Sequence, residues 1–239
     1  MNSKEALSKF AAYTVKETCG KLIVIFDSHN MAFPVWGAYS DEIGSVCQLI
    51  TFDSHSDTLP AFNTYLCKFD LKKDYEKRKL LSYKPLMFGS FVLDKALCIA
   101  ASYLRNDEHI KAACDFGYLS NYTIITNDSE YQKKQQYDAL EGYNCLYFSK
   151  SAWKSEISGH MSSTPIILDF DLDYFTKVRD FADIQCEVLN YLIKNSAIIT
   201  IAREPLYFER CKEDSEGTSF TNDCALSTLL SIIENVLNN

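Results

Sequence analysis

The motif Asp-Ser-His-Ser-Asp at residues 53–57 carries three side chains that can bind a metal ion, directly after the apolar run 46–51. In an extended segment alternate residues point to the same side, so Asp53, His55 and Asp57 are expected to converge on one point. A lone histidine, His29, follows another apolar run. A mixture of imidazole and carboxylate groups is typical of open catalytic metal sites, whereas structural sites are closed and usually rich in sulfur.

A second set of alternating carboxylates, Asp169, Asp171 and Asp173, follows the apolar run 165–168. This run does not fit an EF-hand loop, which needs glycine at its sixth position and glutamate at its twelfth. It does not fit a haloacid-dehalogenase phosphatase either, because only 66 residues follow it and the motif at 53–57 would be left unexplained. Hard ligands at the ends of several strands are expected where open α/β sheets place their active sites, which predicts a metallohydrolase.

The elements that must position these residues follow from the hydrophobic pattern. Short apolar runs alternate with helical patterns, which is typical of a largely parallel sheet with helices on both faces. Because the sequence contains no linker, repeat or low-complexity segment, we expect one α/β domain over residues 1–239. The pattern predicts strands near 22–27, 47–53, 121–126, 144–148, 165–171 and 197–202, and helices near 90–104, 106–116, 180–194 and 223–237.

Composition excludes several classes of partner. The net charge of −8 argues against nucleic acid, whose phosphates require a basic face. The sequence has no signal-peptide pattern and no apolar run long enough to cross a bilayer, so we expect no membrane partner and a cytoplasmic location. The nine cysteines are scattered and are expected to be reduced. The sequence does not predict the oligomeric state.

In order and spacing, His29, the motif at 53–57 and Asp171-Leu172-Asp173 resemble the signature of the arginase (ureohydrolase) superfamily. His29 precedes Asp53 by 24 residues, close to the separation in that family. The resemblance implies two Mn²⁺ ions, a choice that suits mixed imidazole and carboxylate ligands. It further implies that Asp53 and Asp171 bridge the ions, and that Asp169 orients a ligand from behind. One ion would be held by His29, Asp53, Asp57 and Asp171, and the other by Asp53, His55, Asp171 and Asp173.

Within the superfamily, the segments 27–30, 106–110 and 169–175 are similar to the peptide arginases, which convert arginine in ribosomally made precursor peptides to ornithine and urea. The resemblance implies an arginine-containing precursor peptide as the substrate. Asp57 would orient the attacking water and pass its proton to the departing amine. The further candidates are His109 as a proton shuttle, Glu108 as a substrate contact and Glu204 as the partner of the guanidinium.

Two departures from ordinary arginases bear on the substrate. The Gly-Gly-Asp-His motif is absent, and Phe-Asp-Ser-His stands at 26–29. Leu59 stands where arginases carry an asparagine that binds the α-carboxylate of the amino acid, which disfavours free arginine. The alternatives are a ureohydrolase acting on free arginine or agmatine, a single-zinc deacylase, and a non-enzymatic module with a structural metal. The deacylase leaves His29 and the motif at 53–57 without a role, and a structural metal is usually held in a closed site rich in sulfur, whereas this one is rich in carboxylates.

Overall fold

A seven-stranded sheet forms the centre of the computed structural model, which describes residues 2–68, 91–127, 145–157 and 163–239. The strands are β1 (Thr14–Thr18), β2 (Lys21–Phe26), β3 (Cys47–Phe52), β4 (Leu119–Thr126), β5 (Cys145–Ser149), β6 (Ile166–Asp171) and β7 (Ser196–Ala202). They lie in the order β1-β2-β7-β6-β3-β4-β5. Among the strands of the described residues, only β1 pairs antiparallel, so the largely parallel sheet is confirmed.

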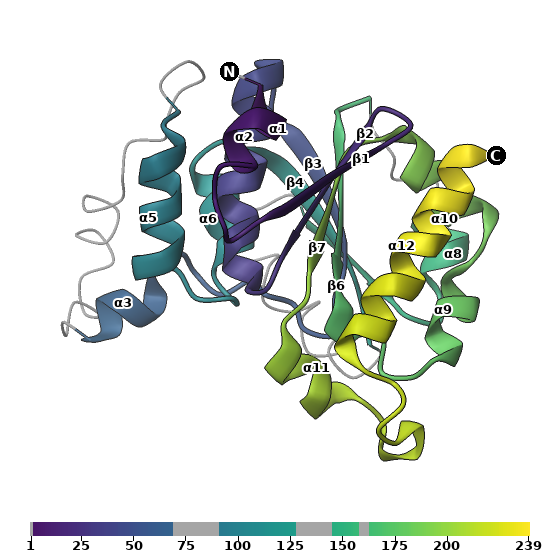
Figure 1. The fold of residues 1–239 in the computed structure, drawn as a ribbon. Coiled ribbons are helices and arrows are strands. Elements are labelled where there is room, and N and C mark those ends of the chain that lie inside the picture. The colour runs from purple at the N-terminus through teal and green to yellow at the C-terminus, as the bar shows by residue number, and fades with distance from the viewer. Residues whose placement is uncertain (1, 69–90, 128–144, 158–162) are drawn as a thin grey trace.

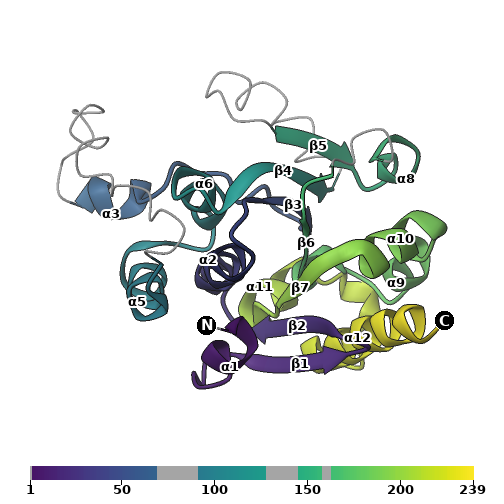
Figure 2. The same ribbon diagram turned by 90° about the horizontal axis from the view of Figure 1, so that it is seen from above.

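Helices cover both faces of this sheet (Figures 1 and 2). One face carries α1 (Ser3–Leu7), α2 (Ala32–Ile43), α5 (Leu93–Tyr103) and α6 (His109–Asp115). The other carries α8 (Trp153–Glu156), α9 (Arg179–Ile184), α10 (Glu187–Asn195) and α12 (Asn222–Asn238). The shorter helices are α3 (Asn63–Lys68), α11 (Pro205–Cys211), and the 3-10 turns η1 (His29–Met31), η5 (Leu172–Tyr174) and η6 (Asp214–Glu216).

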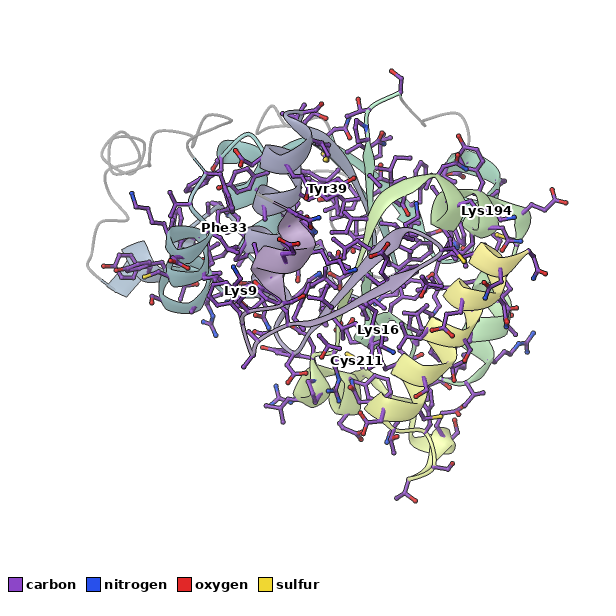
Figure 3. All side chains as sticks on the ribbon, turned by 45° about the horizontal axis from the view of Figure 1, so that its top comes forward. Lys9, Lys16, Phe33, Tyr39, Lys194 and Cys211 are labelled. Carbon is purple, nitrogen blue, oxygen red and sulfur yellow. The ribbon has the colours of Figure 1, made fainter. Side chains whose placement is uncertain are left out.

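Two hydrophobic cores lie on the two faces because successive strand residues point in opposite directions. In β2, Ile23 and Ile25 belong to the core beneath α10 and α12, whereas Val24 and Phe26 belong to the core beneath α2. Figure 3 shows the side chains that fill these spaces, with Phe33 of α2 labelled. Burial on both faces explains why the parallel strands are continuous apolar runs in the sequence.

The six predicted strands are confirmed, but several other elements differ from the prediction, including the short helices α1, α3, α8 and α11, which were not predicted. The edge strand β1 was missed because its Thr-Val-Lys-Glu-Thr sequence is largely exposed. Helix α2 was missed because it is buried almost all round and lacks an amphipathic pattern. The single helix expected over 180–194 is wrong, because Gln185 and Cys186 are extended and separate α9 from α10. Within the described residues, no helix combines the length and apolar character needed to cross a bilayer.

Helix α2 packs so closely at Gly37 that a larger side chain would force neighbouring rings to move. A Cβ added at Gly37 would lie 2.5 Å from Cε2 of Phe91 and 2.8 Å from Cε2 of Tyr118. We therefore expect Gly37→Ala to lower the free energy of unfolding by about 1–3 kcal/mol, the usual effect of overpacking. Urea denaturation measures this change. A variant as stable as the original protein would show that the two rings move aside without cost.

Candidate metal centre

The predicted site residues gather at the carboxyl edge of four adjacent strands, β2, β7, β6 and β3. Phe52 at the end of β3 pairs with Phe170 of β6, so Asp53 follows at the level of Asp171. His29 lies in η1, just beyond the end of β2. Segments far apart in the sequence therefore meet at one edge of the sheet, where parallel α/β folds place their active sites.

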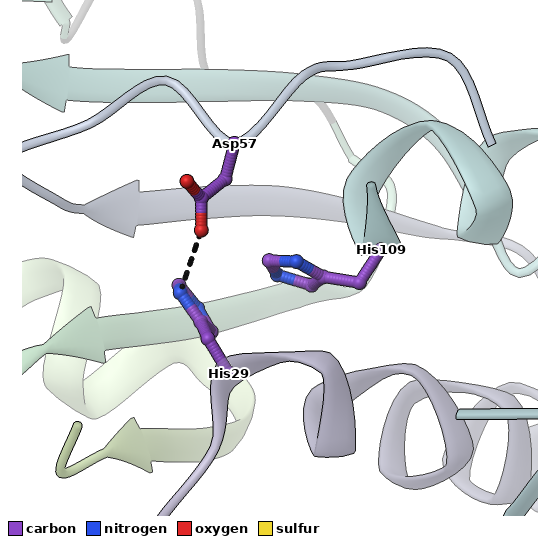
Figure 4. Close-up of side chains that lie close together, drawn as sticks. All are labelled: His29, Asp57 and His109. Carbon is purple, nitrogen blue, oxygen red and sulfur yellow. Dashed lines mark ion pairs between the residues drawn. The ribbon is translucent and has the colours of Figure 1, made fainter. Parts of the chain in front are cut away.

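His29 is fully buried and turns one ring nitrogen toward three carboxylates. Its Nδ1 lies 3.1 Å from Oδ2 of Asp171, 3.2 Å from Oδ2 of Asp57 and 3.7 Å from Oδ2 of Asp53. The ion pair between His29 and Asp57 is drawn in Figure 4. These distances suit a group of ligands around a common point.

Asp169 fixes the orientation of the His29 ring from behind. His29 Nε2 donates to Oδ2 of Asp169 at 2.9 Å, and the hydroxyl of Thr51 donates to the same oxygen at 2.7 Å. The hydroxyl of Thr200 donates to the other carboxylate oxygen. With Nε2 donating to Asp169, Nδ1 faces the group of carboxylates, where its lone pair can bind a metal ion. This is the placement expected of an orienting carboxylate.

Asp169→Asn is therefore expected to weaken the binding of a divalent metal ion, with Mn²⁺ as the probe, about 10- to 100-fold, the usual cost of altering the outer carboxylate partner of a ligating histidine. Equilibrium dialysis with elemental analysis measures the affinity. Thr51→Val is the matched control, since it removes only one hydrogen bond to Asp169 and should have a smaller effect. Unchanged Mn²⁺ affinity in Asp169→Asn would show that His29 does not depend on this partner.

The motif at 53–57 reaches the site by a different backbone path from the one expected. The extended conformation ends with β3, and Asp57 has a left-handed φ of 45°. The prediction of one extended segment is thus wrong, although Asp53 and Asp57 still both face His29. Aspartate is one of the few residues that adopt this backbone conformation readily, because its side chain bonds locally.

The second half of the site centres on Asp173. His55 Nδ1 lies 2.9 Å from Oδ2 of Asp173 but 3.9 Å from Oδ1 of Asp53. The backbone N–H of Asp173 donates to Asp171 at 3.1 Å. Unlike the first ligand set, the four residues expected around the second ion do not form one cluster of donor atoms. Asp173 instead belongs to two smaller groups whose donor atoms lie within 4.8 Å of one another. One group is His55, Asp173 and Cys211, and the other is Asp171, Asp173 and Glu204.

Cys211 was missed by the sequence analysis. It lies at the end of α11, with its Sγ 4.0 Å from Oδ2 of Asp173. Burial, followed by the charge of Asp173, raises the pKa of its thiol to about 11. No spacing rule could have found it, because Cys211 is separated by 38 residues from Asp173 and belongs to no ligand motif.

The charges at this edge of the sheet call for a cation. Burial, and then the neighbouring carboxylates, raise the pKa values of Asp53 and Asp171 well above their usual range. Burial alone would lower the pKa of His29, but the charge of Asp169 and the nearby carboxylates of Asp171 and Asp57 raise it well above its usual value. A bound cation would offset the mutual repulsion of these buried carboxylates.

Two buried atoms indicate where such a cation fits. Among the described residues, His29 Nδ1 and Asp53 Oδ2 have no hydrogen-bond partner, although both are shielded from solvent. Buried polar atoms are almost always satisfied, so an unsatisfied pair facing one another needs an explanation. The donor atoms of His29, Asp53, Asp57 and Asp171 lie within 4.8 Å of one another. This set fits a divalent metal ion that prefers oxygen and imidazole ligands.

A cavity of about 380 Å³ opens beside this group. Glu204 forms part of its wall, and its Oε1 accepts hydrogen bonds from the backbone N–H of His29 at 2.9 Å and from the amide of Asn106. Burial raises the pKa of Glu204 to about 7. The residues that line the cavity are Asn30, His55, Asp57, Leu104, Arg105, Asn106, Asp107, Glu204 and Tyr207.

The two neighbouring candidates, Glu108 and His109, differ in their placement. Glu108 is buried away from the cavity wall, and its carboxylate accepts the backbone N–H groups of Thr64 at 2.7 Å and of Arg105 at 3.4 Å. The carboxylate of Glu108 therefore fixes the backbone of two neighbouring segments and does not line the cavity. His109 does reach the site, with its ring centroid 4.2 Å from that of His29. Burial, and then the charge of His29, lower its pKa well below the usual value.

Comparison with known proteins gives a likeness of fold. No protein-family model matches the sequence, and no curated protein does. One similar structure is formimidoylglutamase from Bacillus subtilis subsp. subtilis str. 168, with a TM-score of 0.50 and 9% identity over 89% of this chain and 60% of that one. A second is proclavaminate amidino hydrolase from Streptomyces clavuligerus, with a TM-score of 0.48 and 12% identity over 90% of this chain and 62% of that one. A third is arginase from Medicago truncatula, with a TM-score of 0.46 and 12% identity over 90% of this chain and 58% of that one. This chain spans about three fifths of their length. The predicted α/β architecture is confirmed, and formimidoylglutamase shares it.

Proposed function

We propose that this protein is a dimanganese hydrolase that cleaves the guanidinium group of arginine side chains in a precursor peptide, giving ornithine and urea. The observation that carries the proposal is the convergence of His29, Asp53, Asp57 and Asp171 within 4.8 Å beside a cavity lined by acidic groups. His55 and Asp173 lie beside this group, 2.9 Å apart, and together with Asp53 and Asp171 they would hold the second ion that the resemblance implies.

The chemistry of the donors supports a hydrolytic metal centre. A pair of divalent ions, when bound, would lower the pKa of a water molecule and polarise the guanidinium. Asp57 lines the cavity, so its carboxylate can hold the attacking water and accept its proton. The water oxygen adds to the guanidinium carbon, the bond from that carbon to the side-chain nitrogen breaks, and Asp57 returns the proton to the departing amine. The products are urea and the amine of ornithine.

The cavity also suits a cationic side chain. Asp57, Asp107 and Glu204 contribute carboxylates to its wall, against the basic residues Arg105 and His55, and His55 is itself a proposed metal ligand. A carboxylate in a partly buried wall can pair with a guanidinium through charge-assisted hydrogen bonds. Glu204 is the residue we assign to that contact, because it is held against the backbone of His29.

The case for a peptide rests on what holds the rest of the substrate. Leu59 replaces a polar residue that would bind a free α-carboxylate, and its side chain is exposed. Without that contact the enzyme gains no binding energy from a free α-carboxylate, so it has no means to prefer a free amino acid over a residue whose carboxyl group forms a peptide bond. Tyr207 lines the cavity and is itself partly exposed, so flanking peptide groups can pack on its ring.

Metal content tests the first half of the proposal. Metal-free protein reconstituted with Mn²⁺ is expected to hold two ions per chain, and its thermal midpoint should rise with Mn²⁺ concentration. Binding to the folded state alone stabilises by about 2.7 kcal/mol at a hundredfold excess over Kd. Elemental analysis and thermal denaturation measure both quantities. One tightly held zinc ion with no second site would contradict the dimanganese assignment.

Mass spectrometry tests the reaction itself. Incubation of arginine-containing peptides with Mn²⁺-loaded protein is expected to lower the peptide mass by about 42 Da per modified arginine, together with release of urea. The matched control peptide carries lysine at the same position, since lysine has the cationic head but no guanidinium carbon. Release of acetate from an acetylated lysine peptide, with no urea from arginine, would favour a deacylase instead.

A further inference from the structure

The imidazole of His109 is held with one nitrogen free and aimed into the site. Its Nδ1 lies 2.6 Å from the backbone carbonyl of Asn106. A carbonyl only accepts hydrogen bonds, so the ring proton is on Nδ1 and the lone pair is on Nε2. Among the described residues, this buried Nε2 has no hydrogen-bond partner. A histidine that donates one nitrogen to a carbonyl and leaves the other bare has the arrangement of a metal ligand.

The position of this nitrogen agrees with its orientation. A donor nitrogen of His109, one of His29 and a carboxylate oxygen of Asp57 lie within 4.8 Å of one another. Metal–ligand bonds of about 2.0–2.2 Å place two ligands of one ion up to about 4.4 Å apart, so only a small movement is needed. Figure 4 shows the ring of His109 extending from α6 toward the gap between His29 and Asp57.

The surroundings of the ring fix it in this place. His109 is fully buried, and the indole of Trp36 lies against it with ring centroids 5.2 Å apart. Trp36 is held in turn by a hydrogen bond from its Nε1 to the hydroxyl of Thr200. A ring held by packing on one side and by a carbonyl on the other is preorganised for a ligand in front of it.

We propose that His109 is a direct ligand of the ion held by His29 and Asp57, in addition to the ligands that the sequence predicted. This ion would then have two imidazole ligands, whereas the ion beside Asp173 would have only His55. The two positions would therefore differ in affinity, with the His29 position filled first. The inference rests on the metal centre of the proposed function and does not depend on its substrate.

The test compares metal binding in His109→Ala, His109→Gln and the original protein, each stripped of metal and titrated with Mn²⁺ by equilibrium dialysis. In His109→Ala, one ion is expected to bind at least about tenfold more weakly while the other is unaffected. His109→Gln keeps a neutral oxygen near the position of Nε2, so its affinity should be intermediate. Pulsed electron paramagnetic resonance of the Mn²⁺-loaded protein should show one nitrogen coupling fewer in both variants.

The control is Ile110→Ala, which empties a buried position on the same helix without removing a ligand. It should bind both ions as the original protein does. Equal loss of Mn²⁺ affinity in Ile110→Ala and His109→Ala would overturn the inference, because disturbed packing of α6 would then explain both. It would also be overturned if His109→Ala bound both ions normally while its turnover fell and was restored by added imidazole, as expected of a proton carrier. Urea release is measured separately, so failure of the proposed function is distinguishable from failure of this inference.

Discussion

Asp53→Ala and Asp171→Ala are each expected to lose both Mn²⁺ ions and to show no urea release above background. Each removes a carboxylate that the proposed site shares between the ions. His29→Ala and His55→Ala each remove a ligand from one ion, so they should keep part of their metal and some turnover at high Mn²⁺. Elemental analysis of dialysed protein and a urea assay over a range of Mn²⁺ concentrations measure both quantities.

Asp169→Ala is the matched control for loss of a buried carboxylate at the same edge of the sheet. Asp169 contacts His29 Nε2, Thr51 and Thr200, so its loss should affect the His29 position alone. Circular dichroism of the metal-free proteins shows whether each variant folds. Equal metal occupancy in the two aspartate and two histidine variants would contradict the assignment of Asp53 and Asp171 as bridging ligands.

A peptide containing arginine is expected to have a kcat/KM at least about 100-fold above that of free arginine, because backbone contacts on both sides add binding energy that is used in the transition state. The absence of a polar residue at Leu59 removes the means to prefer a free α-carboxylate. Urea release from free arginine, agmatine and an arginine peptide of the same concentration measures the ratios.

The informative variant for this prediction is Leu59→Asn, which supplies the amide that ordinary arginases have. It should raise kcat/KM for free arginine relative to agmatine and leave the peptide reaction little changed, since Leu59 lies outside the ligand sets. If free arginine reacts as fast as the peptide, the proposed peptide specificity is wrong and the activity is that of an ordinary arginase. Fast agmatine turnover would make it an agmatinase.

The ends of the central strands could be predicted from the sequence because they combine two strong signals. Asp53 and Asp171 each follow a continuous apolar run, and an abrupt change to hard ligands after such a run identifies the carboxyl end of a buried strand. The signal is local, so the sequence predicted that Asp53 and Asp171 would stand at the same edge of the sheet, where the structure places them. It did not predict that β7 would lie between β2 and β6, because strand order depends on packing between distant segments.

Contacts across the fold were the part that could not be predicted. Cys211 approaches Asp173 only because α11 packs beside η5. The orientation of His109 depends on the backbone carbonyl of Asn106. Every residue has a backbone carbonyl, so the sequence does not indicate which one will accept a hydrogen bond from a histidine. Glu108 illustrates the reverse error, since a carboxylate next to a site histidine was expected in the cavity but bonds the backbone of Thr64 instead. Residue type alone could not separate these cases.

The central position of β7 has a consequence for how the chain folds. β7 pairs with β2 on one side and β6 on the other, for example through Leu22 with Ile198 and Ile167 with Ile198. Such pairings between distant segments are slow to form, since the entropy cost of closing a long loop comes before the stabilising contacts form. During synthesis at about 5–20 residues per second, β2 emerges many seconds before β7.

Until β7 inserts, the edges of β2 and β6 have no partner between them and are open to association with other chains. Metal acquisition is therefore expected to be among the last events of folding, after the most aggregation-prone stage has passed.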